Sequence, residues 1–233
     1  MFRFKQFTVC DERSAMKIGT DGVLLGAWAD IEGDSRILDV GTGTGLIALM
    51  LAQRNASAEI VGVDISHEAI EEARDNFLNS PWGTRLSATL GDVCSFLSDT
   101  MFDHIVSNPP YFIDSLHSPD ALRTMARHTS SLKFEDLVAS AERLLRPEGR
   151  LTVILPTECA MQFRFAAFGR LWLSRQTDVI TKEGDTPRRT LMEFCLTDKP
   201  HIPVVTTLTM RHTDSSYTEE YRKLTEEFYI SLK

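Results

Sequence analysis

The sequence of 233 residues is long enough for one large domain, and 42% hydrophobic with 25% charged residues is the composition of a water-soluble globular protein. Its 33 acidic and 25 basic side chains leave a formal net charge of −8, which argues against indiscriminate binding to nucleic acid but permits a local basic surface. The longest apolar run is much shorter than a membrane span, and the four scattered cysteines indicate neither a zinc ribbon nor a disulfide framework. We therefore expect a cytoplasmic protein with no metal and no membrane contact.

The first 35 residues are expected to be an N-terminal extension, which can fold over a ligand as a lid or form a strand and helix along one sheet edge. From Arg36 onward, short β-like runs alternate with amphipathic helical segments, a pattern typical of a parallel sheet covered by helices. The predicted strands are Arg36–Val40, Glu59–Val63, Leu86–Leu90, His104–Ser107 and Arg150–Leu155, and the predicted helices are Thr44–Arg54, His67–Asn79 and Phe134–Leu145.

Two more strands, Trp172–Ile180 and Arg189–Leu196, are expected to form an antiparallel pair at one edge of the sheet. Residues 36–199 then make the core of the fold, and residues 200–233 close it with a helix over 217–232. This helix would carry an apolar face of Tyr221, Leu224, Phe228 and Leu232. The sequence shows no repeat or linker, so we expect a single domain over 1–233.

The strongest local motif is a glycine-rich turn after the first predicted strand. Gly41, Gly43 and Gly45 have the spacing G-x-G-x-G, and glycine lets the backbone approach a ligand closely. A dinucleotide site would require G-x-G-x-x-G, with a glycine where Leu46 stands. Asp39, two residues before the turn, would also repel a pyrophosphate. The turn is therefore better suited to a cationic or zwitterionic ligand.

Two further carboxylates follow the next two predicted strands. Asp64 comes after the second strand, where it can accept hydrogen bonds from both hydroxyls of a ribose. Asp92 comes after the third, where it can accept one from the exocyclic amine of adenine. Each acid alone would equally suit a helix cap or a solvated loop. Because the carboxyl ends of parallel strands face one crevice, the series with Asp39 favours a ligand site.

This pattern resembles the class I S-adenosylmethionine-dependent methyltransferases over roughly residues 36–155. The resemblance implies an α/β, Rossmann-like fold with a mostly parallel seven-stranded sheet, helices on both faces and an antiparallel edge strand. It also implies a cofactor, S-adenosyl-L-methionine, whose methionine end is held by Asp39 and the glycine loop. The ribose would lie at Asp64, next to Ile65, and the adenine at Asp92, next to Val93.

A tetrapeptide, Asn108-Pro109-Pro110-Tyr111, follows the fourth predicted strand. Asn-Pro-Pro by itself is a common turn, but its place in this sheet suits transfer of a methyl group to an exocyclic amine. Such an amine is conjugated with its ring, and accepting both of its hydrogens at the Asn108 side chain and the Pro109 carbonyl favours a more tetrahedral nitrogen. Two prolines make these acceptors rigid, and Tyr111 offers a flat face for stacking. The motif resembles that of enzymes that methylate adenine N6, guanine N2 or protein glutamine.

The resemblance becomes closer in residues 16–28, 80–82 and 217–229, which together with the tetrapeptide look like the valine-tRNA adenine N6-methyltransferases. That family modifies the adenosine next to the anticodon, and the similarity spans nearly the whole chain. It implies a tRNA partner with no obligate protein partner, and it adds Lys17, Thr20 and Asn108 to the cofactor site. Thr42 and Thr44 stand where related loops often carry Ala or Ser.

The distribution of charge agrees with a local RNA-binding face. Residues 161–190 hold six basic and three acidic side chains, although a solvated basic loop would look the same. Phosphate contacts from such a face would position the RNA while the pocket selects the base. The candidate RNA-binding residues are Arg3, Lys5, Arg123, Arg127, Arg188 and Arg189.

Three other functions remain open on the residues alone. Protein glutamine methylation uses the same tetrapeptide, but it is expected to bring a separate N-terminal helical domain for which 35 residues leave little room. A DNA adenine methyltransferase would be expected to show a target-recognition domain, and none is visible. A non-catalytic RNA-binding module is disfavoured because the candidate residues are all in place, namely Asp39, Asp64, Asp92 and Asn108.

Overall fold

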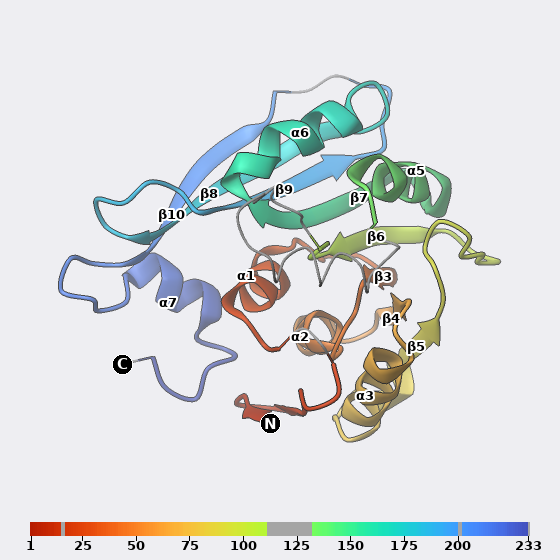
Figure 1. Cartoon of the computed structure of the whole chain (residues 1–233), viewed down its shortest axis with the longest axis horizontal. Coiled ribbons are helices and arrows are strands. Elements are labelled where there is room, and N and C mark those ends of the chain that lie inside the picture. The colour runs from red at the N-terminus through yellow and green to blue at the C-terminus, as the bar shows by residue number, and fades with distance from the viewer. Residues whose placement is uncertain (15–16, 111–131, 200–201, 233) are drawn as a thin grey trace, which may run out of the picture.

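The computed structural model describes residues 1–14, 17–110, 132–199 and 202–232, which form one large sheet with helices on both faces (Figure 1). The strands are β1 (Phe2–Arg3), β2 (Thr8–Val9), β3 (Arg36–Val40), β4 (Glu59–Asp64), β5 (Leu86–Leu90), β6 (Phe102–Ser107), β7 (Leu145–Pro156), β8 (Trp172–Lys182), β9 (Arg189–Cys195) and β10 (Val204–Arg211). The helices are α1 (Thr20–Trp28), α2 (Leu46–Arg54), α3 (His67–Leu78), α5 (Phe134–Leu144), α6 (Thr157–Ala167) and α7 (Glu219–Thr225), with a short 3-10 turn at Gly83–Arg85.

The sheet has the strand order β10-β8-β9-β7-β6-β3-β4-β5. All neighbours are parallel except at β9, which pairs antiparallel with both β7 and β8. The chain runs outward from β3 through β4 to β5, and then returns to the other side of β3 with β6 and β7. In open α/β sheets, ligands bind at the carboxyl ends of the strands where the order reverses in this way, here between β3 and β6. The α/β Rossmann-like fold is confirmed.

Two details of the predicted sheet are wrong. It has eight strands rather than seven, because the segment Val204–Arg211 forms β10 beside β8. The antiparallel pair β8–β9 exists, but it does not lie at an edge, since β10 covers β8 and β9 is inserted next to β7. The β-branched run 204–207 was the available signal for the extra strand.

The closing helix is also shorter than predicted. Helix α7 spans only Glu219–Thr225, and its Thr218 side chain caps it by accepting a hydrogen bond from the Tyr221 amide at 3.2 Å. Beyond it the chain turns, with Phe228 N–H donating to Thr225 O at 3.0 Å. Tyr221 and Phe228 are nevertheless both buried, so these two residues of the predicted apolar face lie in the core although the helix ends before Phe228.

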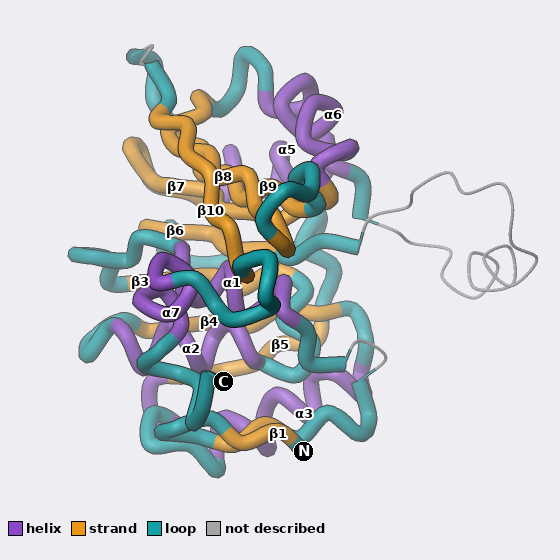
Figure 2. The backbone as a smooth tube through the Cα atoms, turned by 90° about the vertical axis from the view of Figure 1, so that its left-hand side faces the viewer, coloured by secondary structure: helices purple, strands orange, loops and turns teal. Residues whose placement is uncertain are grey.

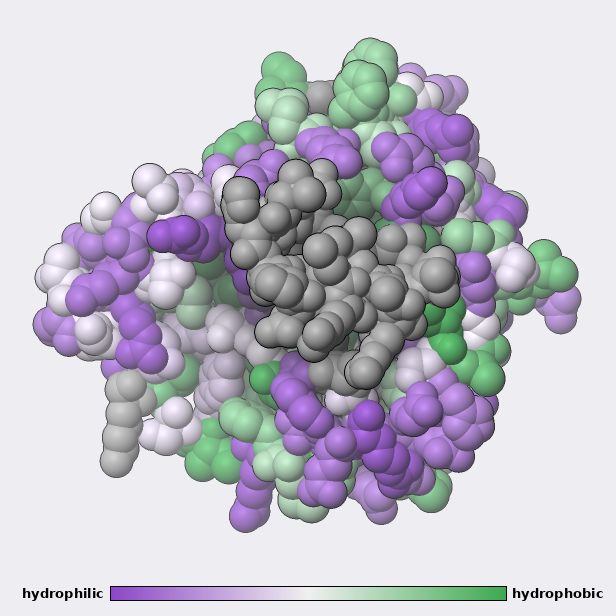
Figure 3. All heavy atoms as spheres, in the orientation of Figure 1, coloured by the Kyte–Doolittle hydropathy of each residue, from purple (hydrophilic) through white to green (hydrophobic). Residues whose placement is uncertain are grey.

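Successive side chains of the central strands point to opposite faces and so supply two hydrophobic cores. Ile37 of β3 packs with α1, α2 and α3, whereas its neighbour Leu38 packs with α5 and α6. In α6 and directly after it, however, Met161, Phe165 and Phe168 are exposed, and hydrophobic atoms gather over this helix at the top of Figure 3. None of the helices in the described ranges is long and apolar enough to cross a membrane.

The two ends of the chain meet at the same side of the molecule (Figure 2). The β1–β2 hairpin buries Phe4 and Phe7, whose rings stack with their centroids 4.7 Å apart. Lys5 N–H donates to Phe228 O at 2.8 Å, which ties the hairpin to the segment after α7. Phe4 and Phe7 of the N-terminal segment are therefore part of the hydrophobic core.

Candidate functional site

The predicted site residues converge because four parallel strands end side by side. In the register of the sheet, Val40 of β3 lies between Val63 of β4 and Ser107 of β6, and Asp64 lies opposite Leu90 of β5. The residues that follow these positions are the glycine loop, Ile65, the loop containing Asp92 and the Asn-Pro-Pro segment. One edge of the sheet thus carries every cofactor and catalytic candidate between positions 39 and 110.

The glycine loop is a tight turn whose backbone requires glycine. Gly41, Gly43 and Gly45 have φ of 70°, 54° and 79°, which is the left-handed region that other residues rarely adopt. Gly45 is the N-cap residue directly before helix α2, and a Cβ added to it would lie only 2.4 Å from Cε1 of Phe77. The loop is anchored to β4, because the amides of Gly41 and Thr42 donate to Val63 O at 2.8 and 3.1 Å.

Asp39 is a fully buried carboxylate beneath this loop. The Thr42 hydroxyl donates to its Oδ2 at 2.7 Å, whereas Oδ1 has no hydrogen-bond partner among the described residues. Burial raises the pKa of Asp39 to about 7, and the hydrogen bond from Thr42 acts in the opposite direction. An unpartnered buried acceptor is costly unless a ligand satisfies it, so Asp39 is suited to a cationic group arriving at this edge.

Asp64 links the glycine loop to helix α3. Its Oδ2 accepts from Gly43 N–H at 3.0 Å, and its Oδ1 accepts from Ser66 N–H at 2.9 Å. Ser66 in turn caps α3 by accepting from the Ala69 amide. Each carboxylate oxygen still has a lone pair for a further donor. Beside Asp64, Ile65 is 54% exposed and leaves an apolar surface at the strand-end edge.

Asp92 and Val93 follow β5 in a short turn. The exposed Asp92 accepts from Cys94 N–H at 2.9 Å through Oδ1, while Val93 is buried in the core. The turn thus uses Oδ1 of Asp92, and the other carboxylate oxygen lies at the strand-end edge.

Asn108 carries the second orphaned acceptor of the site. Its side-chain Oδ1 is buried and has no partner in the described part of the chain. The preceding residue is fixed, because the Ser107 hydroxyl donates to Val40 O at 2.9 Å and so joins β6 to the start of the glycine loop. Pro109 is buried and Pro110 is exposed. Tyr111, the last residue of the tetrapeptide, lies outside the described residues.

Lys17 and Thr20 lie on the approach to helix α1 and are both exposed. The Lys17 ammonium donates to the backbone oxygens of Asp11, Glu12 and Ser14, the latter two at 3.3 Å. Thr20 is the first residue of α1, which packs on α2.

The candidate RNA-binding residues are dispersed. Arg3 and Lys5 are exposed on the β1–β2 hairpin. Arg189 pairs in the sheet with Pro156, at the carboxyl end of β7 and thus at the same edge as the glycine loop. Its Nε donates to Asp21 at 2.7 Å, so it is already engaged in an ion pair, whereas Arg188 beside it is exposed. Arg123 and Arg127 lie outside the described residues.

Reasoning from the sequence did not single out Glu72 and Asn76, two polar side chains of α3. Both are buried, on the same helix face as Ile70, Ala73 and Phe77. The sequence did contain a signal for them. Both polar residues occupy positions where the apolar face of an amphipathic helix normally carries hydrophobic ones.

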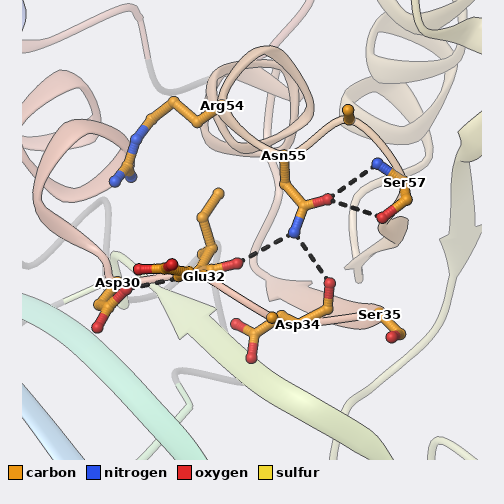
Figure 4. A pocket seen from close by; sticks show the side chains of 10 residues that line it. Asp30, Glu32, Asp34, Ser35, Arg54, Asn55 and Ser57 are labelled. Carbon is orange, nitrogen blue, oxygen red and sulfur yellow. Dashed lines mark hydrogen bonds between the residues drawn. The ribbon is translucent and has the colours of Figure 1, made fainter.

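A pocket of about 450 Å³ lies at the opposite edge of the sheet (Figure 4). It is lined by residues that precede β3 and β4, among them Asp30, Asp34 and Asn55. The Asn55 side chain forms local hydrogen bonds, in which its Nδ2 donates to Ile31 O at 3.0 Å and to Asp34 O at 2.9 Å. These contacts close the turns before the strands, away from the predicted site. In the described ranges, no group of three or more His, Cys, Asp or Glu side chains is placed to hold a metal ion.

Comparison with known proteins agrees with this geometry. Residues 16–177 match the family described as the methyltransferase small domain. The chain is 52% identical over 234 residues to the tRNA1(Val) (adenine(37)-N6)-methyltransferase of Phocaeicola vulgatus, covering 99% of this chain and 98% of that protein. It is 42% identical to the protein of the same name from Tolumonas auensis, covering 99% and 97%.

Solved structures support the fold. A predicted O-methyltransferase from Agrobacterium tumefaciens superposes with a TM-score of 0.70 at 23% identity, covering 89% of this chain and 96% of that one. The N-methyltransferase NodS from Bradyrhizobium japonicum, in complex with S-adenosyl-L-homocysteine, gives a TM-score of 0.52 at 15% identity, covering 75% and 83%.

Proposed function

The chain belongs to the family of the tRNA1(Val) (adenine(37)-N6)-methyltransferases, and on this premise we propose that it methylates N6 of the adenosine next to the anticodon of a valine tRNA. It is a class I enzyme that uses S-adenosylmethionine. The observation that carries the assignment of the site is the pair of buried, unpartnered acceptors, Asp39 Oδ1 in β3 and Asn108 Oδ1 directly after the adjacent strand β6. One acceptor suits a cation and the other an amine.

The residues at the strand ends fit the cofactor. Asp39 would hold the positively charged methionine end, close to the backbone of Gly41, Gly43 and Gly45. Asp64 would accept the ribose hydroxyls with the lone pairs left free by its two backbone contacts. Asp92 would accept from the adenine amine, with Ile65 and Val93 against the ring. When bound, the cofactor supplies a methyl group on a sulfonium, which is an electrophile that a neutral amine can attack.

The Asn-Pro-Pro segment would prepare the amine for that attack. The buried Asn108 Oδ1 would accept one N6 hydrogen and the Pro109 carbonyl the other. Holding both hydrogens draws the nitrogen lone pair out of conjugation and directs it along one line, which is stabilisation by preorganised dipoles rather than removal of a proton. The proton leaves to water after the methyl group has been transferred. Tyr111 would stack on the extruded base.

The substrate RNA would approach the strand-end edge. A base in an anticodon loop is already unpaired, so its extrusion costs little. Arg188, which is exposed beside Arg189 at this edge, would meet a phosphate, and Arg123 and Arg127 follow the tetrapeptide in sequence. Arg3 and Lys5 would meet more distant parts of the tRNA. With a tRNA as substrate, the reaction would take place in the cytoplasm.

The test is an Asn108→Ala variant measured with labelled cofactor and a valine tRNA transcript. Loss of one preorganised polar contact of this kind typically costs roughly 100-fold or more in turnover. Affinity for the cofactor, measured separately by calorimetry, should stay within a few-fold, because Asp39 and Asp64 are unchanged. Asn79→Ala, on the exposed end of α3, is the matched control and should keep full activity. An Asn108→Ala protein that retains half of its turnover would sink the assignment.

A further inference from the structure

Residues 10–14 form a turn that is held by two buried polar side chains of helix α3. Glu72, 1% exposed, accepts three successive backbone amides, from Glu12 and Arg13 at Oε1 (2.7 and 2.9 Å) and from Ser14 at Oε2 (2.8 Å). The neighbouring Asn76, one turn further along the helix, exchanges two hydrogen bonds of 2.9 Å with the backbone of Cys10.

The same turn borders the glycine loop. Asn76 Nδ2 also donates to Thr44 O at 2.8 Å, so a single amide joins the turn to the loop. The buried Ser14 has its Oγ 3.8 Å from the place that a Cβ on Gly43 would occupy. The position of the turn is thus set relative to the backbone that would hold the methionine end of the cofactor.

On its other side the turn binds the ammonium of Lys17. The carbonyl of Asp11 and the amide of Glu12 belong to one peptide group, and the carbonyl of Glu12 and the amide of Arg13 belong to the next. In both groups the N–H points to the Glu72 carboxylate and the C=O accepts from the Lys17 Nζ. Two whole peptide dipoles are therefore aligned between a buried negative charge and a positive charge.

This alignment explains how a buried carboxylate is tolerated. No cationic side chain pairs with Glu72 in the described ranges, and burying a charge without compensation is costly. Three amide donors and the Lys17 charge beyond them supply the compensation. Because both oxygens of Glu72 accept backbone amides, a neutral amide side chain in its place would set its own N–H against one of them, so this turn requires a carboxylate.

We propose that Glu72 is a positioning residue of the methyl-donor site, which acts through these two peptide groups to place the Lys17 ammonium for the carboxylate of S-adenosylmethionine. The inference rests on the proposed function. An ammonium has three donors, and two of the Lys17 contacts are long at 3.3 Å, so a ligand carboxylate can replace one of them without loss of the turn. Asn76, which hydrogen-bonds to both, fixes the position of the turn relative to the glycine loop.

The experiment compares two ligands by calorimetry, S-adenosylhomocysteine, which has the amino-acid carboxylate, and 5′-methylthioadenosine, which lacks it. In Glu72→Gln, one amide donor of the side chain would face a backbone amide, so the turn and Lys17 lose their position. We expect roughly tenfold weaker binding of S-adenosylhomocysteine and less than twofold change for 5′-methylthioadenosine. Glu71→Gln, the same change at an exposed neighbour, should alter neither affinity.

A Lys17→Met variant provides the second arm, since Lys17 is exposed and its replacement leaves the core intact. It should show the same ligand-selective loss, and adding Glu72→Gln to it should cause no further loss, because Glu72 acts through Lys17. Equal losses for both ligands, additive effects in the double variant, or an unchanged affinity in Lys17→Met would each overturn the proposal. If the wild type bound neither ligand, the cofactor site itself would be refuted, a result separate from these.

Discussion

Asp39 should make the protein without its cofactor less stable as the pH rises. Burial raises its pKa from 3.8 to about 7, so between these values the folded protein keeps a proton on Asp39 that the unfolded chain has released. The folded state therefore binds more protons in this window, and raising the pH through it lowers the free energy of unfolding. Asp39→Asn removes the titration and with it this part of the pH dependence.

The size of the effect follows from the shift in pKa. One pKa unit corresponds to about 1.4 kcal/mol, and integration from pH 5 to pH 7 gives a loss of about 2 kcal/mol in the wild type relative to Asp39→Asn. The asparagine also buries an amide donor that has no partner at the Oδ1 position, which costs about 1–3 kcal/mol at every pH. Only the change with pH is diagnostic, because this second cost is constant.

The assay is urea denaturation of both proteins at pH 5, 6 and 7 without cofactor, under identical salt. As the pH rises from 5 to 7, the free energy of unfolding of the wild type should fall by about 2 kcal/mol relative to that of Asp39→Asn. Thr42→Val removes the hydrogen bond that lowers the pKa of Asp39, so its loss of stability should continue to higher pH. Parallel pH profiles for wild type and Asp39→Asn would refute the argument that burial controls this carboxylate.

Three further predictions concern the cofactor, the RNA and the glycine loop. Asp64→Ala should raise the dissociation constant for S-adenosylmethionine at least about tenfold in calorimetry, since charge-assisted hydrogen bonds are worth roughly 1.5–3 kcal/mol each, and unchanged affinity would show that Asp64 only ties loops together. Arg188→Gln should weaken binding of valine tRNA and reduce its salt slope by about one unit, and parallel salt plots would mean that no phosphate lies there. Gly45→Ala should destabilise the fold by more than Gly33→Ala, because both glycines have φ near 78° but only Gly45 would drive a Cβ into Phe77; equal losses in urea denaturation would contradict the steric argument.

The central sheet was predictable because its strands are short runs of β-branched and aliphatic residues closed by turns. Arg36–Val40 and Leu86–Leu90 have the bounds that the sequence pattern indicates. Strand β10 was not found, since its polar threonines resemble an exposed segment and its place beside β8 depends on pairing with residues about 30 positions earlier. The helix after it stops at Thr225 although the apolar spacing continues, because the chain turns to bring Phe228 into the core.

The site was predictable to the extent that it follows from strand topology. Carboxylates after successive parallel strands must meet at one edge, which places Asp39 and Asp64 without knowledge of coordinates. Contacts between distant segments could not be derived in this way. Arg189 is paired with Asp21, 168 residues earlier in the chain, so of the two adjacent candidates Arg188 and Arg189 only Arg188 is exposed. The role of Glu72 likewise depends on backbone amides 58 to 60 residues away.

The most direct test of the central claim is the identity of the methylated product. The wild-type protein is incubated with methyl-labelled S-adenosylmethionine and total tRNA together with a protein extract, and both fractions are digested and analysed. We predict that the label appears as N6-methyladenosine in valine tRNA, and that a transcript with guanosine in place of the adenosine next to the anticodon accepts none. Label found in protein glutamine, or N6-methyladenosine formed equally in the substituted transcript, would contradict the proposed function.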